Sequence, residues 1–435
     1  MSLENPYFAL YFFQYAYSSM NPPPKLENPR FDEPLCSRCG LCMGNAWATA
    51  ESLKSCVFNT GWLGAHEERL FGRTRNMHDA DELRFGISRE RFNAVMKKPL
   101  EGAQWSGIIT AISTEALQTG LVDGVVTLQG TTFQPKAVLA TTAEEIHAAR
   151  GNKPVLSPVL QALHTAWKKK VKKLLVVGAS CHVHVLRDFA ATHPWLDGIE
   201  LLVVGIPCTD NLEPAHLKWV FRHISRSPDT VLNFEFMQDY KVHIVHSTGK
   251  VEKIPFFSLP AAVLKVGVFS NSCMSCFDYI NSLADITVGY FGAPYTADGK
   301  EQWILIRTDK GKKLFDLVKN DISVRPETGS GDSFGAVKAS IQPTIGPILQ
   351  PHLLGDRRSM PLFFGKLLSA LKAKKGPRGI EFARYSIDIH ALRNYFFVRH
   401  YTPERLDVLV PEHIRHLVKL YNVTDFDDLP PHSEK

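Results

Sequence analysis

Several features common in other proteins are missing from this 435-residue chain, and each absence narrows the range of functions. No apolar run approaches the roughly 20 residues that a membrane-spanning helix needs, so we expect no transmembrane segment. No Gly-x-Gly-x-x-Gly motif follows an expected strand, so a Rossmann-type dinucleotide site is not predicted. No nucleic-acid-binding motif accompanies the net charge of +6, and we expect no nucleic-acid partner.

Cysteine is also scarce, with eight residues in the chain, yet its distribution is the most informative feature present. A long chain with few cysteines has no need of disulfides, and nothing at its N-terminus resembles a signal peptide, so a disulfide framework is not expected. The cysteines fall into two sets of four. The first set is Cys36, Cys39, Cys42 and Cys56, and the second set is Cys181, Cys208, Cys273 and Cys276.

The first set has the spacing of an iron-sulfur protein. Cys36-x2-Cys39-x2-Cys42 places three thiolates around one point, as a cubane cluster requires, and a fourth cysteine must come from elsewhere. Zinc ribbons usually pair two Cys-x2-Cys knuckles instead, so a cluster is favoured over zinc. Two clusters of the 4Fe-4S type would use every cysteine in the chain.

From about residue 100 the sequence alternates between helical and strand patterns. Apolar residues at helical spacing predict helices over 108–117, with Ser106 as the cap, and over 212–224. Short β-branched runs predict strands at 124–128, 173–178 and 201–205. This alternation is typical of an α/β fold.

Two cysteines of the second set follow expected strands directly. Cys181 comes after the strand 173–178, and Cys208 comes after the strand 201–205. Open α/β sheets bind ligands at the carboxyl ends of their strands, so these two thiols can converge on one site. That position favours joining them with the Cys273-x2-Cys276 pair.

Five motifs in this region resemble the beta-subunit family of deazaflavin-reducing hydrogenases. They are Glu101 to Gly107, Asn152 to Ser157, Gly178 to Cys181, Gly205 to Cys208, and Ser272 to Asp278 followed by Leu283 to Gly289. The resemblance covers roughly residues 100 to 320. It implies an FAD-binding module in which the second cysteine set ligates a 4Fe-4S cluster.

The resemblance also implies where FAD binds. The expected contacts are Gly102, Gln104, Trp105, Ser106, Gly107, Lys153 and Ser157. The glycines allow close backbone approach, and the helix that Ser106 is expected to cap offers an N-terminus suited to a pyrophosphate. A plain capped helix is the alternative interpretation. Arg73 and Arg75 are either further phosphate ligands or ordinary loop residues.

A fuller resemblance spans nearly the whole chain. The runs 36–42, 234–239, 273–279, 379–385 and 393–395 resemble the ferredoxin-dependent 8-vinyl reductases of (bacterio)chlorophyll synthesis and the related 7-hydroxymethyl chlorophyll a reductases. The resemblance implies reduction of the 8-vinyl group of divinyl chlorophyllide or protochlorophyllide, with electrons passing from ferredoxin through two 4Fe-4S clusters to FAD. The stretch 43–55 departs from the family pattern, so Cys56 is less defined as a ligand than the three cysteines before it.

Two other functions stay open. A 7-hydroxymethyl reductase shares the same machinery, and an electron-transfer subunit of a hydrogenase-like or formate dehydrogenase-like complex would have no catalytic role. No catalytic residue is assigned, although side chains beside the cluster cysteines are candidate proton donors: His182, His184, Asp210, Asp278 and Tyr279. Three arginines of the C-terminal region are candidate ligands of a pigment carboxylate: Arg384, Arg393 and Arg399.

The expected architecture is an α/β flavin module with a central mixed or parallel sheet, an N-terminal ferredoxin-like iron-sulfur lobe and a C-terminal extension. The divisions are an aromatic arm (1–30), the Cys-rich lobe (31–98), the FAD and iron-sulfur module (99–325) and the extension (326–435). The lobe has too few aliphatic residues for a core of its own, so a cluster is expected to hold it. The arm is expected to pack on the body of the protein or on a second copy, which leaves a homo-oligomer open.

Charge and location complete the expectations. Lysine runs at 168–170, 172–173 and 372–375 are either solvated helix faces or a surface that attracts acidic ferredoxin. We expect a protein of the cytoplasm of a photosynthetic bacterium, in solution or at a membrane surface.

Overall fold

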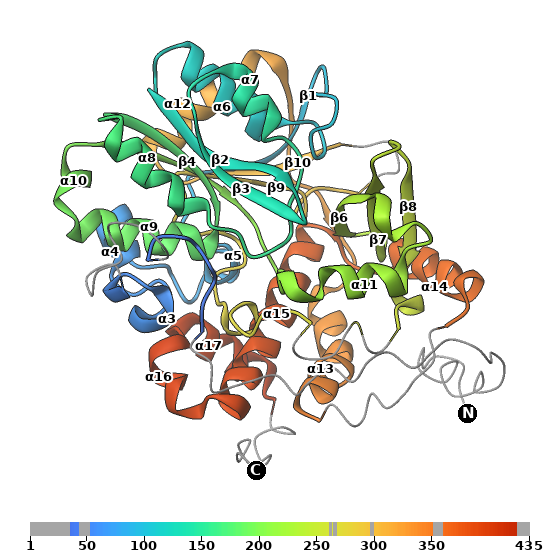
Figure 1. The fold of residues 1–435 in the computed structure, drawn as a ribbon. Coiled ribbons are helices and arrows are strands. Elements are labelled where there is room, and N and C mark those ends of the chain that lie inside the picture. The colour runs from blue at the N-terminus through green and yellow to red at the C-terminus, as the bar shows by residue number, and fades with distance from the viewer. Residues whose placement is uncertain are drawn as a thin grey trace, which may run out of the picture.

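A mixed sheet of eight strands forms the centre of the computed structural model, which describes residues 35–42, 53–260, 263, 268–295, 300–350 and 360–423 (Figure 1). The order is β11-β1-β10-β9-β5-β4-β2-β3. The strands are β1 (Glu90–Met96), β2 (Gly124–Thr131), β3 (Gln134–Ala140), β4 (Lys173–Ala179), β5 (Glu200–Ile206), β9 (Ile286–Gly289), β10 (Gln302–Ile306) and β11 (Ile322–Arg325). Neighbours among β9, β5, β4 and β2 run parallel, and the remaining pairs are antiparallel. The α/β class and the mixed sheet are therefore confirmed.

The parallel strands are apolar on both faces because helices cover both. Along β4, Leu174 and Val176 belong to one core, while Leu175 and Val177 belong to the core on the opposite face, as the two-residue period of a strand requires. The first face packs against α8 (Ala162–Lys168) and α9 (Ser180–Thr192), and the second against α6 (Ile108–Gln118) and α12 (Asp309–Asp316). Two short helices, α7 (Ala143–Ala148) and α10 (Pro194–Asp197), complete this part.

The predicted helices and strands are largely confirmed. The three predicted strands correspond to β2, β4 and β5, and the helix predicted over 108–117 is α6. The helix predicted over 212–224 is shorter, since α11 spans Leu217–Ile224. Its first residues differ because Leu212 forms isolated bridges with Val155 and Phe269, and a 3-10 turn begins at Pro214.

The N-terminal region packs on the body of the protein. Its described helices are α3 (Val57–Thr60), α4 (His66–Phe71) and α5 (Ala80–Phe85). Leu41, Phe58 and Trp62 share one core with β4 and β5. The central sheet also begins before the boundary predicted at residue 98, because Phe92 and Ala94 of β1 are buried in its core. The aromatic arm, residues 1–30, lies outside the described residues.

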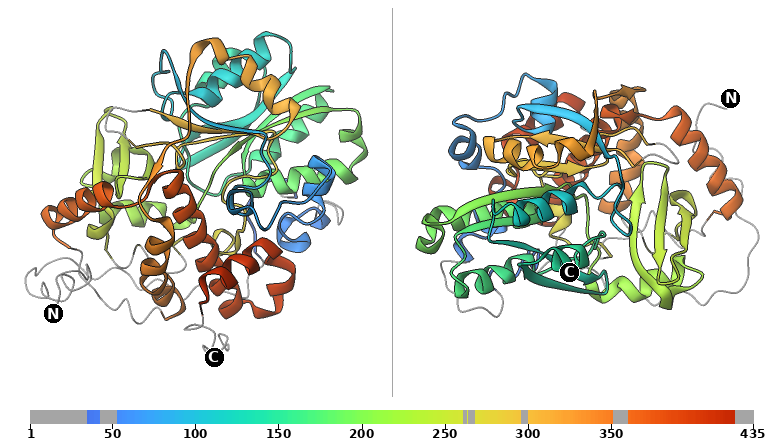
Figure 2. Two further views of the ribbon diagram at one scale, coloured as in Figure 1. Left: turned by 180° about the vertical axis from the view of Figure 1, so that it is seen from behind. Right: turned by 90° about the horizontal axis from the view of Figure 1, so that it is seen from above.

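A smaller sheet stands beside the central one (Figures 1 and 2). It has the order β6-β7-β8 and comprises β6 (Val231–Met237), β7 (Lys241–His246) and β8 (Val251–Pro255). Its apolar side chains form a core with α11, and α14 (Leu362–Lys375) packs against β8. This second sheet supplies one wall of the site described below.

The C-terminal region is part of the body of the protein. It comprises α13 (Ser333–Leu349), α15 (Ile380–Tyr401), α16 (Leu406–Leu409) and α17 (Glu412–Tyr421), with the short strand pair β12 (Gly329–Ser330) and β13 (Arg378–Gly379). Figure 2 shows these helices gathered on the side of the sheet that carries the N-terminal helices, and they share one buried core with that face. Within the described residues, no helix combines the length and apolarity needed to cross a bilayer.

Candidate functional site

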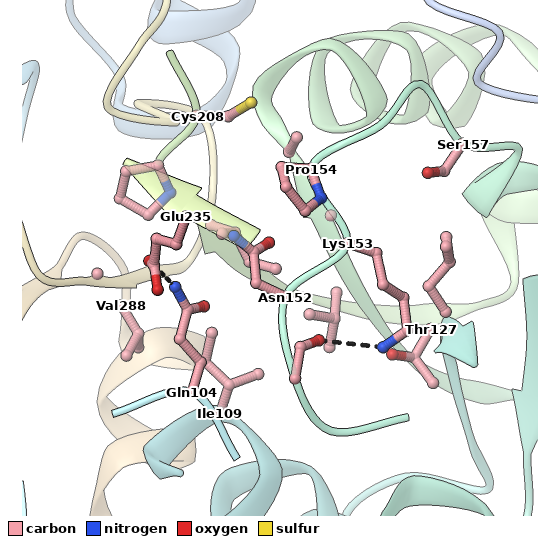
Figure 3. A pocket seen from close by; sticks show the side chains of 18 of the residues that line it. Gln104, Ile109, Thr127, Asn152, Lys153, Pro154, Ser157, Cys208, Glu235 and Val288 are labelled. Atoms are coloured by element: carbon pink, nitrogen blue, oxygen red, sulfur yellow. Dashed lines mark hydrogen bonds between the residues drawn. The ribbon is translucent and has the colours of Figure 1, made fainter. Parts of the chain in front are cut away.

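A cavity of about 240 Å³ lies at the carboxyl ends of the parallel strands (Figure 3). Its walls come from the ends of β4, β5 and β9, from the residues that begin α6, from the loop 149–157 and from β6 of the smaller sheet. This is the position at which open α/β sheets bind ligands. The cavity therefore lies where the sequence predicted a ligand site.

Five of the seven predicted flavin contacts line this cavity: Gln104, Trp105, Gly107, Lys153 and Ser157. Gly102 is not part of the lining, but its φ of +73° favours glycine. A Cβ atom at this position would lie 2.8 Å from Nε of Arg150, and Arg150 does line the cavity. Ser106 also lies outside the lining and is fully buried.

The prediction that Ser106 caps α6 is wrong. The N-cap residue is Gly107, whose φ of 88° and ψ of 22° place it in the left-handed region. The hydroxyl of Ser106 instead donates to Oε1 of Gln302 at 3.0 Å, and the amide of Ile108 donates to the same oxygen at 3.4 Å. A side chain of β10 thus takes the place of the expected cap.

Lys153 presents a cation on the wall formed by the loop 149–157. Its ammonium donates to the carbonyls of Ala149 at 3.0 Å, Arg150 at 3.2 Å and Gly151 at 3.0 Å. Burial lowers the pKa of Lys153 to about 8. The three N–H donors of the ammonium are directed at these carbonyls, so Lys153 brings positive charge rather than a free donor to the cavity wall.

Glu235 lies on the opposite wall, on β6, and sequence reasoning did not single it out. Figure 3 shows its carboxyl group facing Gln104, whose side-chain amide donates to it. Burial raises the pKa of Glu235 to about 8. The run 234–239 carried part of the family resemblance, but the alternation of a strand does not reveal which residue faces a cavity.

The structure brings the second cysteine set together beside this cavity. Cys181 begins α9 after β4, Cys208 follows β5, and Cys273 and Cys276 lie at the 3-10 turn η6 (Cys273–Ser275). Burial raises the pKa of Cys273 well above its usual value, and the neighbouring Cys208 and Cys181 raise it further. Cys208 also lines the cavity.

Hydrogen-bond donors point at the sulfur atoms of this set. The amide of Asn211 donates to Sγ of Cys273 at 3.3 Å, and the side-chain amide of Asn211 donates to Sγ of Cys208 at 3.5 Å. Hydrogen bonds to the sulfurs are one means by which proteins tune iron-sulfur clusters.

The first cysteine set lies next to the second. Burial raises the pKa of Cys39, and Cys181 of the second set contributes, as do Cys56 and Cys42. The hydroxyl of Ser272 donates to the carbonyl of Cys36 at 2.7 Å, which holds the segment 35–42 against η6. Residues 43–52, which include most of the stretch that departs from the family pattern, lie outside the described residues.

The donor sets fit clusters better than single ions. All eight cysteines are free of disulfides. Among the residues whose placement is described, no group of three or more His, Cys, Asp or Glu side chains is arranged to hold a metal ion. Free thiols with N–H donors aimed at sulfur, as at Cys208 and Cys273, are the donor chemistry that iron-sulfur clusters use in proteins.

The C-terminal helix α15 supports the loops that carry two cysteines of the second set. The side-chain amide of Asn394 donates to the carbonyls of Cys273 at 2.8 Å and Cys276 at 2.7 Å. Arg393 forms two 2.8 Å hydrogen bonds with the carboxylate of Asp210. The extension is therefore part of the candidate site, a role that its sequence did not reveal.

The candidate proton donors from the sequence have internal partners. His184 lies 2.9 Å from Asp278, and the ring of His182 lies 3.1 Å from the carbonyl of Ser157. The hydroxyl of Ser386 donates to Tyr279 at 3.2 Å. His182, Asp210 and Tyr279 nevertheless line the cavity.

The candidate anion ligands outside the cavity are also engaged in ion pairs. Arg384 pairs with Asp81 at 2.7 Å and with Glu381, and Arg75 pairs with Glu67 at 2.6 Å. Arg73 pairs with Glu82, and Arg393 pairs with Asp210 as described above. None of these four arginines lines the cavity. They stabilise the fold in this structure and do not bring a cationic group to the cavity wall.

Comparison with known proteins places these features in a family. Residues 91–164 match the N-terminal part, and residues 171–329 the C-terminal part, of the coenzyme F420 hydrogenase/dehydrogenase beta subunit. The 7-hydroxymethyl chlorophyll a reductase of Oryza sativa subsp. japonica is 37% identical over 89% of this chain and 82% of its own length. An uncharacterized protein of Nostoc sp. is 42% identical over 90% of this chain and 94% of its own length.

Matches to the F420 proteins themselves are more distant. The coenzyme F420 hydrogenase subunit beta of Methanosarcina barkeri is 31% identical over 50% of this chain and 74% of its own length. A chain of the solved F420-reducing NiFe hydrogenase complex from the same organism aligns with a TM-score of 0.49 at 22% identity, covering 66% of this chain and 90% of that chain.

Proposed function

Because the chain belongs to the coenzyme F420 hydrogenase/dehydrogenase beta subunit family of oxidoreductases, we propose that it reduces a side group of a chlorophyll-type macrocycle. The observation that carries this proposal is the likeness to 7-hydroxymethyl chlorophyll a reductase, which extends over 89% of this chain. An alignment of that extent reaches well beyond residues 91–164 and 171–329, which the family descriptions match. A pigment reductase therefore explains more of the chain than the F420-binding relatives, which match about half of it.

The proposed substrate is divinyl chlorophyllide or protochlorophyllide, whose 8-vinyl group becomes ethyl. The support for this choice is the resemblance of the five runs between residues 36 and 395 to the 8-vinyl reductases. Reduction of a 7-hydroxymethyl group is the second candidate, and the likeness to the rice 7-hydroxymethyl chlorophyll a reductase favours it. Both reactions consume two electrons and two protons.

The proposed cofactors are FAD and two 4Fe-4S clusters. The cavity offers FAD a glycine-bounded helix start at Gly107, a polar side chain at Gln104 and a cation at Lys153. When bound there, the flavin would supply the change from single electrons to a hydride equivalent. The two cysteine sets supply four thiolates to each cluster.

The proposed electron path runs from ferredoxin to the first set, then to the second set and finally to the cavity. Two observations support this order: Cys181 lies near enough to Cys39 to contribute to the raised pKa of Cys39, and Cys208 lines the cavity. The proposed location is the cytoplasm of a photosynthetic bacterium, either in solution or at a membrane surface.

The test is anaerobic turnover by the reconstituted protein with reduced ferredoxin. Divinyl chlorophyllide, divinyl protochlorophyllide and 7-hydroxymethyl chlorophyll a are offered separately, and products are followed by absorption and mass. A gain of two hydrogens identifies vinyl reduction, and the loss of one oxygen identifies hydroxymethyl reduction. If no pigment changes while the protein passes electrons to a soluble acceptor, the proposal fails and the electron-transfer subunit is the better interpretation.

A further inference from the structure

Glu235 links the two sheets across the cavity. It lies on β6 of the smaller sheet, whereas Gln104 belongs to the segment before α6 of the main module. The bond from the Gln104 amide occupies one side of the carboxyl group, as Figure 3 shows. The rest of the carboxyl group is left on the cavity wall, within reach of whatever fills the space.

The groups around Glu235 leave it without a cation. Tyr290 stacks on Trp105 with ring centroids 4.9 Å apart and donates its hydroxyl to the carbonyl of Phe236. His243 lies opposite Glu235 in the β6–β7 register, but its ring pairs with Asp239 at 2.9 Å.

The other charged or titratable groups nearby are also engaged. Two of them bind Asp239: the hydroxyl of Tyr295 donates to it at 3.3 Å, and Lys241 pairs with it at 3.6 Å. The other two donate to backbone carbonyls: Lys153 to the three carbonyls described above, and Arg150 to the carbonyl of His147. Among the described ion pairs, none includes Glu235.

A carboxyl group in this setting holds its proton near neutral pH. Removal from water favours the uncharged form, because no neighbouring cation offsets the lost hydration. A protonated carboxyl has one O–H donor. The side chains of Gln104 and Trp105 both act as donors toward this carboxyl group and lower its pKa, but burial has the larger effect. Both donors are directed at acceptor oxygens, so the O–H group of the protonated acid is left to point into the cavity.

We propose that Glu235 gives the proton that the substrate takes up during reduction, an inference that rests on the proposed function. In vinyl reduction the carbon–carbon π bond breaks, one carbon takes a hydride equivalent, which a bound reduced flavin would supply, and the other carbon takes the proton of Glu235. In hydroxymethyl reduction the carbon–oxygen bond breaks instead, the carbon takes the hydride equivalent, and the proton of Glu235 leaves with the hydroxyl group as water. In both cases Glu235 becomes a carboxylate and regains a proton from solvent.

The first test is Glu235→Gln, which keeps the shape and the polarity of the side chain but cannot release a proton as an acid. Loss of a general acid lowers rates by about 100-fold to 10,000-fold. We expect a fall of that size in pigment reduction, with unchanged flavin content and unchanged reduction of the bound cofactors by dithionite. Glu235→Asp should restore part of the rate and shift its pH profile.

The matched control is Glu252→Gln on β8 of the same sheet. Glu252 accepts from Ser225 at 2.8 Å and lies outside the cavity lining. Its variant should reduce pigment at the wild-type rate. Full turnover by Glu235→Gln would overturn the inference, as would an equal loss in the Glu252 variant.

A second readout needs neither cofactor nor substrate. In the infrared spectrum of the wild-type protein, a buried protonated carboxyl should give a C=O band that disappears as pH rises through about 8, and Glu235→Gln should lack this band. Absence of the band from the wild-type protein would overturn the inference. If the band is present but the wild-type protein reduces no pigment, the proposed function has failed, and proton transfer to a pigment fails with it.

Discussion

The two cysteine sets differ in what holds their ligands in place. The second set stands on core elements: two of its members follow β4 and β5, and Asn394 binds the carbonyls of the other two. Three members of the first set lie on the short segment 35–42. This segment is bound to the body of the protein by two hydrogen bonds between Cys36 and Ser272 and by a 2.8 Å hydrogen bond from the Leu160 amide to the carbonyl of Cys39. The second set is therefore fixed by strands of the central sheet and by α15, whereas three members of the first set depend on one short segment, which these bonds and the burial of Leu41 in the core hold in place.

The strongest test of this difference removes a ligand of the second set. Cys276→Ala should abolish pigment reduction, release about half of the iron and weaken flavin binding, because this cluster is proposed to lie between the first cluster and the cavity. Iron analysis, visible spectra and turnover measure the three effects. Unaltered cluster spectra would contradict the ligand role of Cys276.

Loss of a first-set ligand should be more selective. Cys39→Ala should also release about half of the iron, but flavin should stay bound, because this set does not line the cavity. Ferredoxin-driven reduction should be lost while dithionite-driven reduction continues. Retention of all the iron in Cys39→Ala would show that the partition into two sets is wrong.

The support given by Asn394 can be tested without removing a cysteine. Asn394→Leu removes the donor from the buried carbonyl of Cys276, at a cost of about 1–3 kcal/mol for an unsatisfied group, whereas the carbonyl of Cys273 keeps a bond from the Cys276 amide at 3.2 Å. We expect a lower free energy of unfolding and faster loss of the second cluster in a chelator. Ser272→Ala, which affects the first set, should cost less in stability, and an equal effect of the two variants would remove the contrast drawn above.

The smallest expected effect concerns the ferredoxin surface. The end of α8 carries three exposed lysines, Lys168, Lys169 and Lys170. The turn before α8 packs closely on the segment that carries the first set: a Cβ atom on Gly40 would lie 2.8 Å from the carbonyl oxygen of Pro158. Replacing the three lysines by glutamate should slow ferredoxin-driven turnover several-fold at low salt, and the difference should shrink as salt screens the charges. The dithionite-driven rate should not change.

Two other outcomes of the lysine experiment are informative. Equal loss of both rates would indicate misfolding of the variant. No loss of either rate would make the lysine run an ordinary solvated helix end.

Local sequence patterns predicted local structure well. The β-branched runs gave β2, β4 and β5, because strands buried on both faces need continuous apolar residues. The position of two cysteines after strands also followed from the sequence. The cap of α6 did not, because Gln302, which binds Ser106, lies 196 positions away in the chain.

Long-range contacts account for the other differences. Glu235 was missed because its partner Gln104 is 131 residues distant, and the supporting role of α15 was missed because Asn394 binds residues 118 and 121 positions earlier. A pattern with a period of two or four residues contains no information about such pairs. The place of β1 in the central sheet, before residue 98, depends on the same kind of contact, because its partners are β10 and β11.

The contacts of α15 also have a consequence for how the protein is made. Its Asn394 binds the carbonyls of Cys273 and Cys276, and its Arg393 pairs with Asp210, which lies near Cys208. Its Asp388 binds Arg84 of the N-terminal region at 2.8 Å. A ribosome makes residues 380–401 long after every cysteine has emerged. The second ligand set therefore cannot reach its final position during most of translation, and the assembly machinery should deliver that cluster to a nearly complete chain.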